Sequence, residues 1–260
     1  MTSFQIGAQM FSVRDRCQDA GSMLSAMQAL YEAGYRNVQF SGHNKEITAA
    51  QLRDMLDKTG MQCSATHISF QEMEEDLDKV IADHKLIGCA YPGIGGLPKE
   101  YRGSPEGFLE FARRATAVAD KLADAGLHFI YHNHAFEFTR FAENKKTGLE
   151  MLFEHCGKNV QFELDVFWVQ RGGGNPLEWI RKAKGRMDVV HFKEMNGTLD
   201  NNAVIAPIGT GNLDWKAIMA ACEEIGVKYA YIEQDNAVET DSIACMKVSH
   251  DYLAGLGGRF

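Results

Sequence analysis

The chain has 260 residues, of which 45% are hydrophobic, and a formal net charge of −8. This length suits one large domain or two small ones, and the acidic balance, without a Lys/Arg-rich run, argues against nucleic acid and anionic membranes as partners. The six cysteines show no C-x-x-C spacing, and neither a signal peptide nor an apolar run of about 20 residues is recognisable, so we expect a cytoplasmic protein with reduced thiols.

Short apolar segments alternate with amphipathic segments of helical period along the whole chain. The predicted strands are 4–11, 35–40, 61–70, 89–95, 127–134, 160–168, 187–195 and 228–235, and the predicted helices that follow them are 22–34, 48–60, 71–88, 104–126, 147–157, 175–185, 213–226 and 239–256. Glycines expected to end helices in the left-handed conformation are Gly34, Gly60, Gly126, Gly157, Gly185 and Gly226. Eight strand–helix units predict a single (β/α)8 TIM barrel over residues 1–260, and segment 196–212 is predicted to be a functional loop.

Polar residues stand at the ends of the later predicted strands, where barrel active sites form. His132, Asp165, His191 and Glu233 come from four successive strands. Together they predict one divalent metal ion, since imidazole and carboxylate ligands suit Mn²⁺, Co²⁺, Fe²⁺, Zn²⁺ or Mg²⁺. Each residue also has a structural alternative: a hydrogen-bonded core histidine, a helix cap for Asp165, or an ion pair with Lys193 for Glu233.

Five segments resemble the xylose isomerase-like barrel superfamily, in its sugar phosphate isomerase/epimerase branch. They are YHNHAFEF, ELDVFWVQRGGGNPLEWI, VVHFKEM, PIGTGNLDW and YIEQD, and they follow the family order. The resemblance implies a metal, manganese preferred, held by Glu, Asp, His and Glu, of which Asp165, His191 and Glu233 match the last three. Many members have the first glutamate at the position of His132, whereas inosose dehydratases resemble this chain in having a histidine-rich strand there. His134 or Glu137 could serve as the first ligand instead.

The expected chemistry is proton abstraction beside the carbonyl of a ketose, polyol-ketone or keto-sugar, through an enediolate that the metal stabilises. Glu233 is the predicted base. His134 and Glu137 are further acid/base candidates, and Lys193 would stabilise an oxyanion or neutralise Glu194 or Asp235.

Two other outcomes remain open for the same residues. The family's epimerases use two metal-bound glutamates, and here one is missing, so a dehydratase or lyase that resembles inosose dehydratase or eliminates a keto-glycoside is an alternative. A non-catalytic sugar-binding barrel is a second one. An abasic-site endonuclease of this fold would need more histidine ligands and a basic groove.

The substrate is predicted to be a small carbohydrate. His67, at the end of the third strand, and Trp168 and Arg171, after the sixth, are predicted to contact it, because sugars stack on aromatic rings and bind charged side chains. Few basic residues lie near Gly209 and Gly211, where such barrels bind phosphate, so we expect an unphosphorylated substrate. The resemblance also implies a homodimer or homotetramer.

Overall fold

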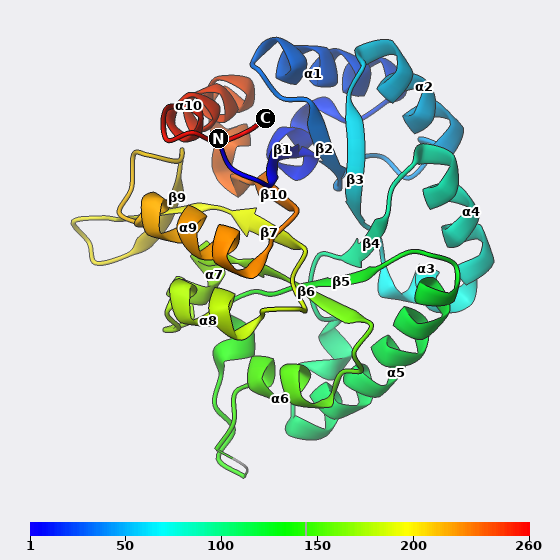
Figure 1. Ribbon diagram of the computed structural model, residues 1–260, viewed down its shortest axis with the longest axis vertical. Coiled ribbons are helices and arrows are strands. Elements are labelled where there is room, and N and C mark those ends of the chain that lie inside the picture. Colours follow the sequence, from blue (N-terminus) through cyan, green and yellow to red (C-terminus); the bar gives the residue numbers. More distant parts are fainter. Residues whose placement is uncertain (144) are drawn as a thin grey trace.

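The computed structural model describes residues 1–143 and 145–260, and its centre is a closed ring of parallel strands (Figure 1). The ring strands are β1 (Gln5–Gln9), β2 (Asn37–Phe40), β3 (Gln62–His67), β4 (Tyr91–Ile94), β5 (Phe129–His132), β6 (Val160–Asp165), β7 (Val189–Phe192) and β10 (Tyr229–Ile232). Strand β10 closes the ring by pairing in parallel with β1, with Ile6 opposite Ala230. The predicted (β/α)8 barrel is confirmed.

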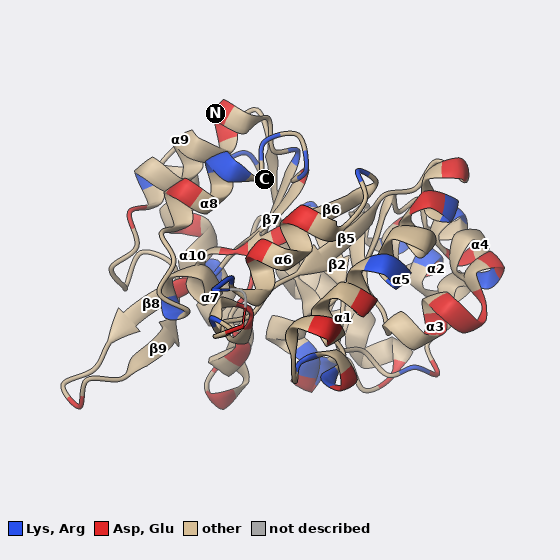
Figure 2. Ribbon diagram, turned by 90° about the horizontal axis from the view of Figure 1, so that it is seen from below, with Lys and Arg blue, Asp and Glu red and all other residues tan. Residues whose placement is uncertain are grey.

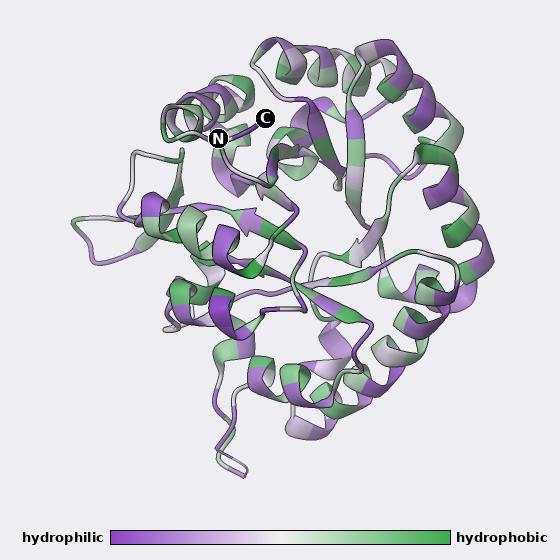
Figure 3. Cartoon of the chain, viewed as in Figure 1, coloured by the Kyte–Doolittle hydropathy of each residue, from purple (hydrophilic) through white to green (hydrophobic). Residues whose placement is uncertain are grey.

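Helices surround the ring (Figure 1). The α-helices are α1 (Ala20–Glu32), α2 (Ala49–Thr59), α3 (Phe70–Glu75), α4 (Leu77–Ile87), α5 (Pro105–Asp124), α6 (Gly148–His155), α7 (Val166–Arg171), α8 (Pro176–Lys182), α9 (Trp215–Ile225) and α10 (Ser242–Gly255). Short 3-10 helices are η1 (Met10–Arg16), η2 (Lys99–Tyr101), η3 (Phe136–Phe138) and η4 (Asp235–Glu239). Hydrophobic and hydrophilic residues alternate along the outer helices, as amphipathic helices on a barrel require (Figure 3).

Helix ends follow the capping residues of the sequence. Ser104 caps α5 with Pro105 in its first turn, and Thr48 caps α2 in a capping box. The predicted helix 71–88 is in fact two helices, because Asp76 leaves the helical conformation and its carboxylate accepts the Lys79 N–H at the start of α4. Gly157 is a second correction: it does not adopt the left-handed conformation, because α6 ends at His155 and its C-cap, Cys156, already has extended backbone.

The segment predicted as an irregular loop, 196–212, contains part of an antiparallel hairpin. It pairs β8 (Glu194–Gly197) with β9 (Ala203–Ala206) and projects from one end of the molecule (Figure 2). The predicted strand 187–195 therefore divides into β7 and the start of this hairpin. Figure 2 also shows acidic and basic residues interspersed over the outer helices.

The two termini lie side by side on one end of the barrel (Figure 1). The Thr2 N–H donates to the Gly257 carbonyl, and the Ile6 N–H donates to the Arg259 carbonyl. Within residues 1–143 and 145–260, no helix is long and apolar enough to cross a membrane.

Strand alternation positions the functional side chains. Successive residues of a strand point to opposite sides of the sheet, so every second residue enters the barrel. In β6, Glu163 and Asp165 both lie on the inner side, and in β7 and its extension His191 and Lys193 do the same, as their mutual contacts show. Two polar residues on each of two adjacent strands therefore face one interior space.

Candidate metal centre

The predicted metal ligands His132, Asp165, His191 and Glu233 meet at the carboxyl end of the strand ring, and they are called the candidate metal centre below. His132 ends β5, Asp165 ends β6, His191 lies in β7 and Glu233 directly follows β10. All four are buried, and one ligand atom from each lies within 4.8 Å of the other three. Because parallel strands end on one side of a barrel, residues far apart in the sequence converge here.

The spacing of these atoms suits a divalent cation. His132 Nε2 lies 3.3 Å from Asp165 Oδ2 and 3.9 Å from Glu233 Oε2, and His191 Nδ1 lies 2.8 Å from Glu233 Oε2. A cation about 2.1 Å from each ligand places neighbouring ligands roughly 3.0–3.4 Å apart in octahedral or tetrahedral coordination. The first distance lies in this range, and the other two differ from it by about 0.5 and 0.2 Å, so the four residues could hold a metal ion after small movements of their side chains. The geometry favours His132 over His134 and Glu137 as the fourth member of the set.

Asp165 caps a helix, as one interpretation of the sequence predicted, and it also faces the candidate metal centre. Its Oδ1 accepts the Trp168 N–H at 3.0 Å and so caps α7, whereas Oδ2 faces the candidate metal centre. Its own N–H donates to Asn133 Oδ1 at 3.0 Å, which ties the end of β6 to the end of β5. Burial raises the pKa of Asp165, but the charge of Lys193 and the hydrogen bond with His132 lower it more strongly. The pKa of Asp165 therefore lies below its ordinary value.

A layer of polar residues lies beneath His191. The nitrogen Nε2 of His191 is 2.6 Å from Gln39 Oε1 and 3.2 Å from Glu163 Oε1. Glu163 also accepts from Gln39 Nε2 at 2.8 Å and is bound by His67 Nε2, while His67 Nδ1 lies 3.4 Å from Gln9 Nε2. This layer fixes the orientation of the His191 ring, as the hydrogen-bond partners of metal ligands generally do.

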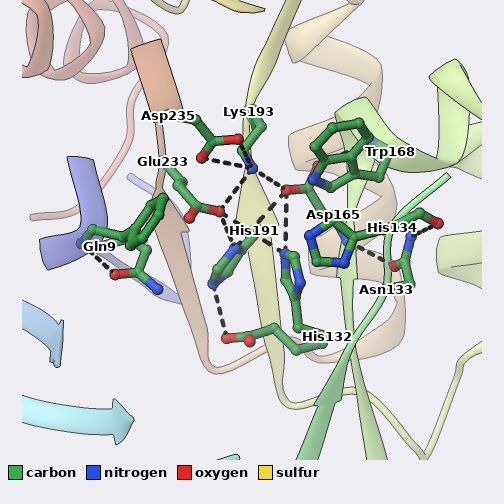
Figure 4. Close-up of polar contacts among 12 residues, drawn as sticks. Gln9, His132, Asn133, His134, Asp165, Trp168, His191, Lys193, Glu233 and Asp235 are labelled. Carbon is green, nitrogen blue, oxygen red and sulfur yellow. Dashed lines mark hydrogen bonds and ion pairs between the residues drawn. The ribbon is translucent and has the colours of Figure 1, made fainter. Parts of the chain in front are cut away.

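Lys193 places a positive charge against the carboxylates of the candidate metal centre (Figure 4). Its side chain is 1% exposed, and Nζ lies 3.1 Å from Asp165 Oδ2 and 2.9 Å from Glu233 Oε2. A third contact, 3.2 Å long, joins it to Asp235. Burial alone would lower the pKa of Lys193, but these carboxylates raise it above its ordinary value. The ammonium group thus neutralises two oxygens that also face the cation position.

Burial and neighbouring charges shift the pKa values of Glu233 and Asp235 in opposite directions. Burial raises the pKa of Glu233, but Lys193 and His191 outweigh it and hold that pKa well below its usual range. For Asp235, burial and the nearby negative charge of Glu233 raise the pKa to about 6. Glu233 is therefore ionised at neutral pH.

His134 and Trp168 form an aromatic wall beside the candidate metal centre. Their ring centroids are 5.1 Å apart, and His134 stacks on Phe136. Lys193 Nζ lies 5.2 Å from the Trp168 ring. Burial, together with the positive charges of His132 and Lys193, lowers the pKa of His134 to about 3, so the ring is neutral. Within the described part of the chain, His134 Nδ1 and Trp168 Nε1 are buried without a hydrogen-bond partner.

Glu137 and Arg171 lie outside the group that the structure brings together. Glu137 is buried, and its two oxygens accept from the Tyr131 hydroxyl at 2.7 Å and the His134 N–H at 2.9 Å. Burial raises its pKa to about 8. Arg171 ends α7 and is exposed. The contacts of Glu137 are those of a residue that supports the turn after β5.

Glu194 organises the segment between β7 and α9. Its carboxylate accepts from the backbone N–H groups of Met195, Gly209 and Leu213 and from the Trp215 indole N–H. The side chain is fully buried. Lys193 pairs with Asp235 rather than with Glu194. Lys193 therefore belongs to the surroundings of the candidate metal centre, whereas Glu194 holds the segment between β7 and α9.

The metal-free protein is expected to lose stability as the pH rises from about 6.5 to about 10. Burial lowers the pKa of His191, but Glu163 and Glu233 raise it to about 10, against about 6.5 in an unfolded chain. The folded protein therefore holds an extra proton between these values, and the resulting stabilisation is complete below pH 6.5 and lost as the pH passes 10. Urea unfolding in chelator at several pH values measures this loss of stability. The free energy of unfolding of His191→Asn should change less with pH than that of the unmodified protein. Parallel pH profiles of the two proteins would contradict the expectation.

Comparisons with known proteins agree with this architecture. The sequence model described as xylose isomerase-like TIM barrel matches residues 27–248. A sugar phosphate isomerase/epimerase from Parabacteroides distasonis superposes with a TM-score of 0.79 at 21% identity, over 97% of this chain and 94% of that chain. A D-allulose 3-epimerase from Methylomonas sp. gives 0.73 at 16%, over 98% of each chain. The probable 3-DHS dehydratase AsbF from Bacillus anthracis gives 0.72 at 14%, over 96% of this chain and 99% of that chain.

No curated protein sequence matches the chain. At the identities of these solved structures, the structural likeness shows the fold alone. The family model, by contrast, covers most of the chain, from α1 to α10. The chain belongs to the xylose isomerase-like TIM barrel family.

Proposed function

We propose that this protein is a divalent-metal-dependent sugar isomerase or epimerase that acts on an unphosphorylated ketose, polyol-ketone or keto-sugar. The observation that carries the proposal is the convergence of His132, Asp165, His191 and Glu233 at the carboxyl end of the barrel. The sugar isomerase and epimerase names of structurally similar proteins support the same class.

The side chains around the centre have distinct tasks in this reaction. A divalent cation held by the candidate metal centre would polarise the substrate carbonyl and stabilise negative charge on its oxygen. Glu233, the ionised carboxylate that directly follows β10, accepts the proton from the neighbouring carbon and can return it to the substrate. Lys193 offers its ammonium group to developing negative charge. His134 lies across His132 and Asp165 from Glu233, and its neutral ring can bind a substrate hydroxyl on that side (Figure 4).

A lyase reaction is the second candidate, and the identity of His132 favours it. A second glutamate at this position would supply the opposing base of an epimerase, whereas an imidazole at the end of β5 does not. After proton removal by Glu233, loss of a β-hydroxyl or alkoxyl group would complete a dehydration or a glycoside elimination. A dehydratase is among the similar structures, which is in keeping with this alternative.

Proton exchange in heavy water tests the proposal. The protein is incubated in D2O with Mn²⁺ and a panel of ketoses, inososes and 3-keto-glucosides, and the C–H signal beside the carbonyl is followed by NMR. We expect the signal to disappear with Mn²⁺, to persist in chelator and to disappear again when Mn²⁺ is restored. Release of water or of an aglycone would select the lyase. Metal-bound protein that exchanges no member of the panel would favour a non-catalytic sugar-binding barrel.

A further inference from the structure

The two ring nitrogens of His191 face two different groups of residues. Nδ1 lies 2.8 Å from Glu233 Oε2 at the candidate metal centre (Figure 4). Nε2 lies 2.6 Å from Gln39 Oε1 and 3.2 Å from Glu163 Oε1, in the layer beneath. A neutral imidazole carries one N–H, and only its other nitrogen can bind a metal ion. The partners of Nε2 therefore decide whether Nδ1 is free to bind a cation.

The hydrogen bonds around His67 run in one direction, which begins at Gln9. Gln9 Oε1 accepts the Phe11 N–H at 2.8 Å, so the amide turns its Nε2 towards His67 Nδ1, 3.4 Å away. An amide nitrogen only donates, so Nδ1 of His67 is the acceptor and the ring proton resides on Nε2. This Nε2–H donates to Glu163 Oε2. Both ring nitrogens of His67 are therefore engaged within the protein.

Glu163 passes this direction on to Gln39. Its Oε2 accepts from His67, and its Oε1 lies 2.8 Å from Gln39 Nε2. Because a carboxylate only accepts, the Gln39 amide presents its NH2 group to Glu163 and its carbonyl oxygen to His191. The carbonyl oxygen also only accepts, so a proton of His191 resides on Nε2. Gln39, Glu163 and His191 are fully buried, so water does not replace any of these partners.

We infer that Glu163 is a positioning residue that keeps a proton on His191 Nε2 and so directs the Nδ1 lone pair of this ring to the divalent cation. Glu163 acts through the Gln39 amide and through its own contact with Nε2. Hydrogen bonds of this kind raise the basicity of a ligating imidazole, and their loss usually weakens metal binding by about 10–100-fold. The inference rests on the metal site of the proposed function and concerns the binding of the metal, not the reaction.

Replacing Glu163 with glutamine tests this role, because it keeps the size of the side chain and removes the group that only accepts. The substituted amide can donate as well as accept, so the Gln39 amide is free to turn its NH2 group towards His191. The His191 proton would then move to Nδ1 and block the metal. We expect the dissociation constant for Mn²⁺ to rise about 10–100-fold. Isothermal titration calorimetry on chelator-treated protein measures this constant without any substrate.

Nitrogen NMR of the unmodified protein tests the inference without depending on the folding of a variant. The protein carries isotope-labelled histidine and is saturated with Zn²⁺, which is diamagnetic and accepts imidazole and carboxylate ligands. His191→Asn identifies the signals of the His191 ring. We expect this ring to be bound to Zn²⁺ through Nδ1 and to carry its proton on Nε2. Binding of Zn²⁺ through Nε2, or not through His191 at all, would overturn the inference.

Glu194→Gln is the control for the loss of a buried carboxylate. Glu194 is also fully buried, but its partners are backbone N–H groups and the Trp215 indole, outside the layer beneath His191. Its Mn²⁺ dissociation constant should equal that of the unmodified protein, and urea unfolding in chelator shows that both variants are folded. Unchanged Mn²⁺ affinity in Glu163→Gln, or equal weakening in both variants, would overturn the inference. Neither measurement contains substrate, so failure of the proposed function is recognised separately, by proton exchange.

Discussion

Replacing Glu233 with glutamine is expected to lower the rate of metal-dependent C–H exchange by about 10²–10⁴-fold, the usual contribution of a positioned general base. Glutamine retains the shape and one oxygen of the side chain but cannot accept the proton. The substitution also removes a charge from the candidate metal centre, so metal binding should weaken. Exchange is therefore measured by NMR at Mn²⁺ concentrations that restore one bound ion per chain, with metal content determined on the same samples.

The matched control for this variant is Glu239→Gln. Glu239 is an exposed carboxylate in η4, on the same connection between β10 and α10. Its exchange rate and metal content should equal those of the unmodified protein. Full exchange activity in metal-loaded Glu233→Gln would show that another group removes the proton, and His134→Ala would then identify or exclude the imidazole on the opposite side.

Replacing Lys193 with methionine should destabilise the metal-free protein by about 3–5 kcal/mol, the usual cost of removing one partner from a buried ion pair. The Nζ group is in contact with Asp165, Glu233 and Asp235, and all of these contacts are within 3.2 Å. Without the ammonium group, these carboxylates repel one another in a region shielded from water. Because a bound divalent cation can neutralise them instead, Mn²⁺ should stabilise this variant more than it stabilises the unmodified protein. Urea unfolding with chelator and with saturating Mn²⁺ measures both effects.

Lys228→Met is the control for the lysine variant. Lys228 also pairs with an aspartate, Asp188, at 2.9 Å, but its side chain is 55% exposed. Exposed ion pairs contribute about 0–1 kcal/mol, so this change should have a small effect that does not depend on Mn²⁺. If Lys193→Met in chelator were as stable as the unmodified protein, the ammonium group would not be the counter-ion of the candidate metal centre.

The barrel and the candidate metal centre were predictable because both follow from repeated features of the chain. Apolar strands and amphipathic helices alternate regularly, and parallel strands in a closed ring must end on one side. His132, Asp165, His191 and Glu233 each follow an apolar run at an equivalent point. Their convergence is therefore a consequence of topology and needs no detailed knowledge of side-chain packing.

Residues that act through a single partner were harder to predict. Glu163 could have been identified, since it lies two positions before Asp165 and so on the same side of β6. Gln39 and Gln9 carry no comparable signal, because a neutral amide in a strand is compatible with many environments. Glu137 closely follows His132 and His134, but the turn that contains η3 directs its carboxylate to Tyr131. The direction of such a turn depends on packing that sequence periodicity does not report.

The carboxylate of Glu194 holds the base of the β8–β9 hairpin in place, so the hairpin tip can be changed without altering the barrel. It binds the backbone at Gly209 and Leu213 and the indole of Trp215, so the return path of the chain is secured at the base of the hairpin. The hairpin tip, with the fully exposed Leu199, lies beyond these contacts. Peptide insertions, epitope tags or fluorophore sites at the tip should therefore leave the register of β7, and with it His191, undisturbed.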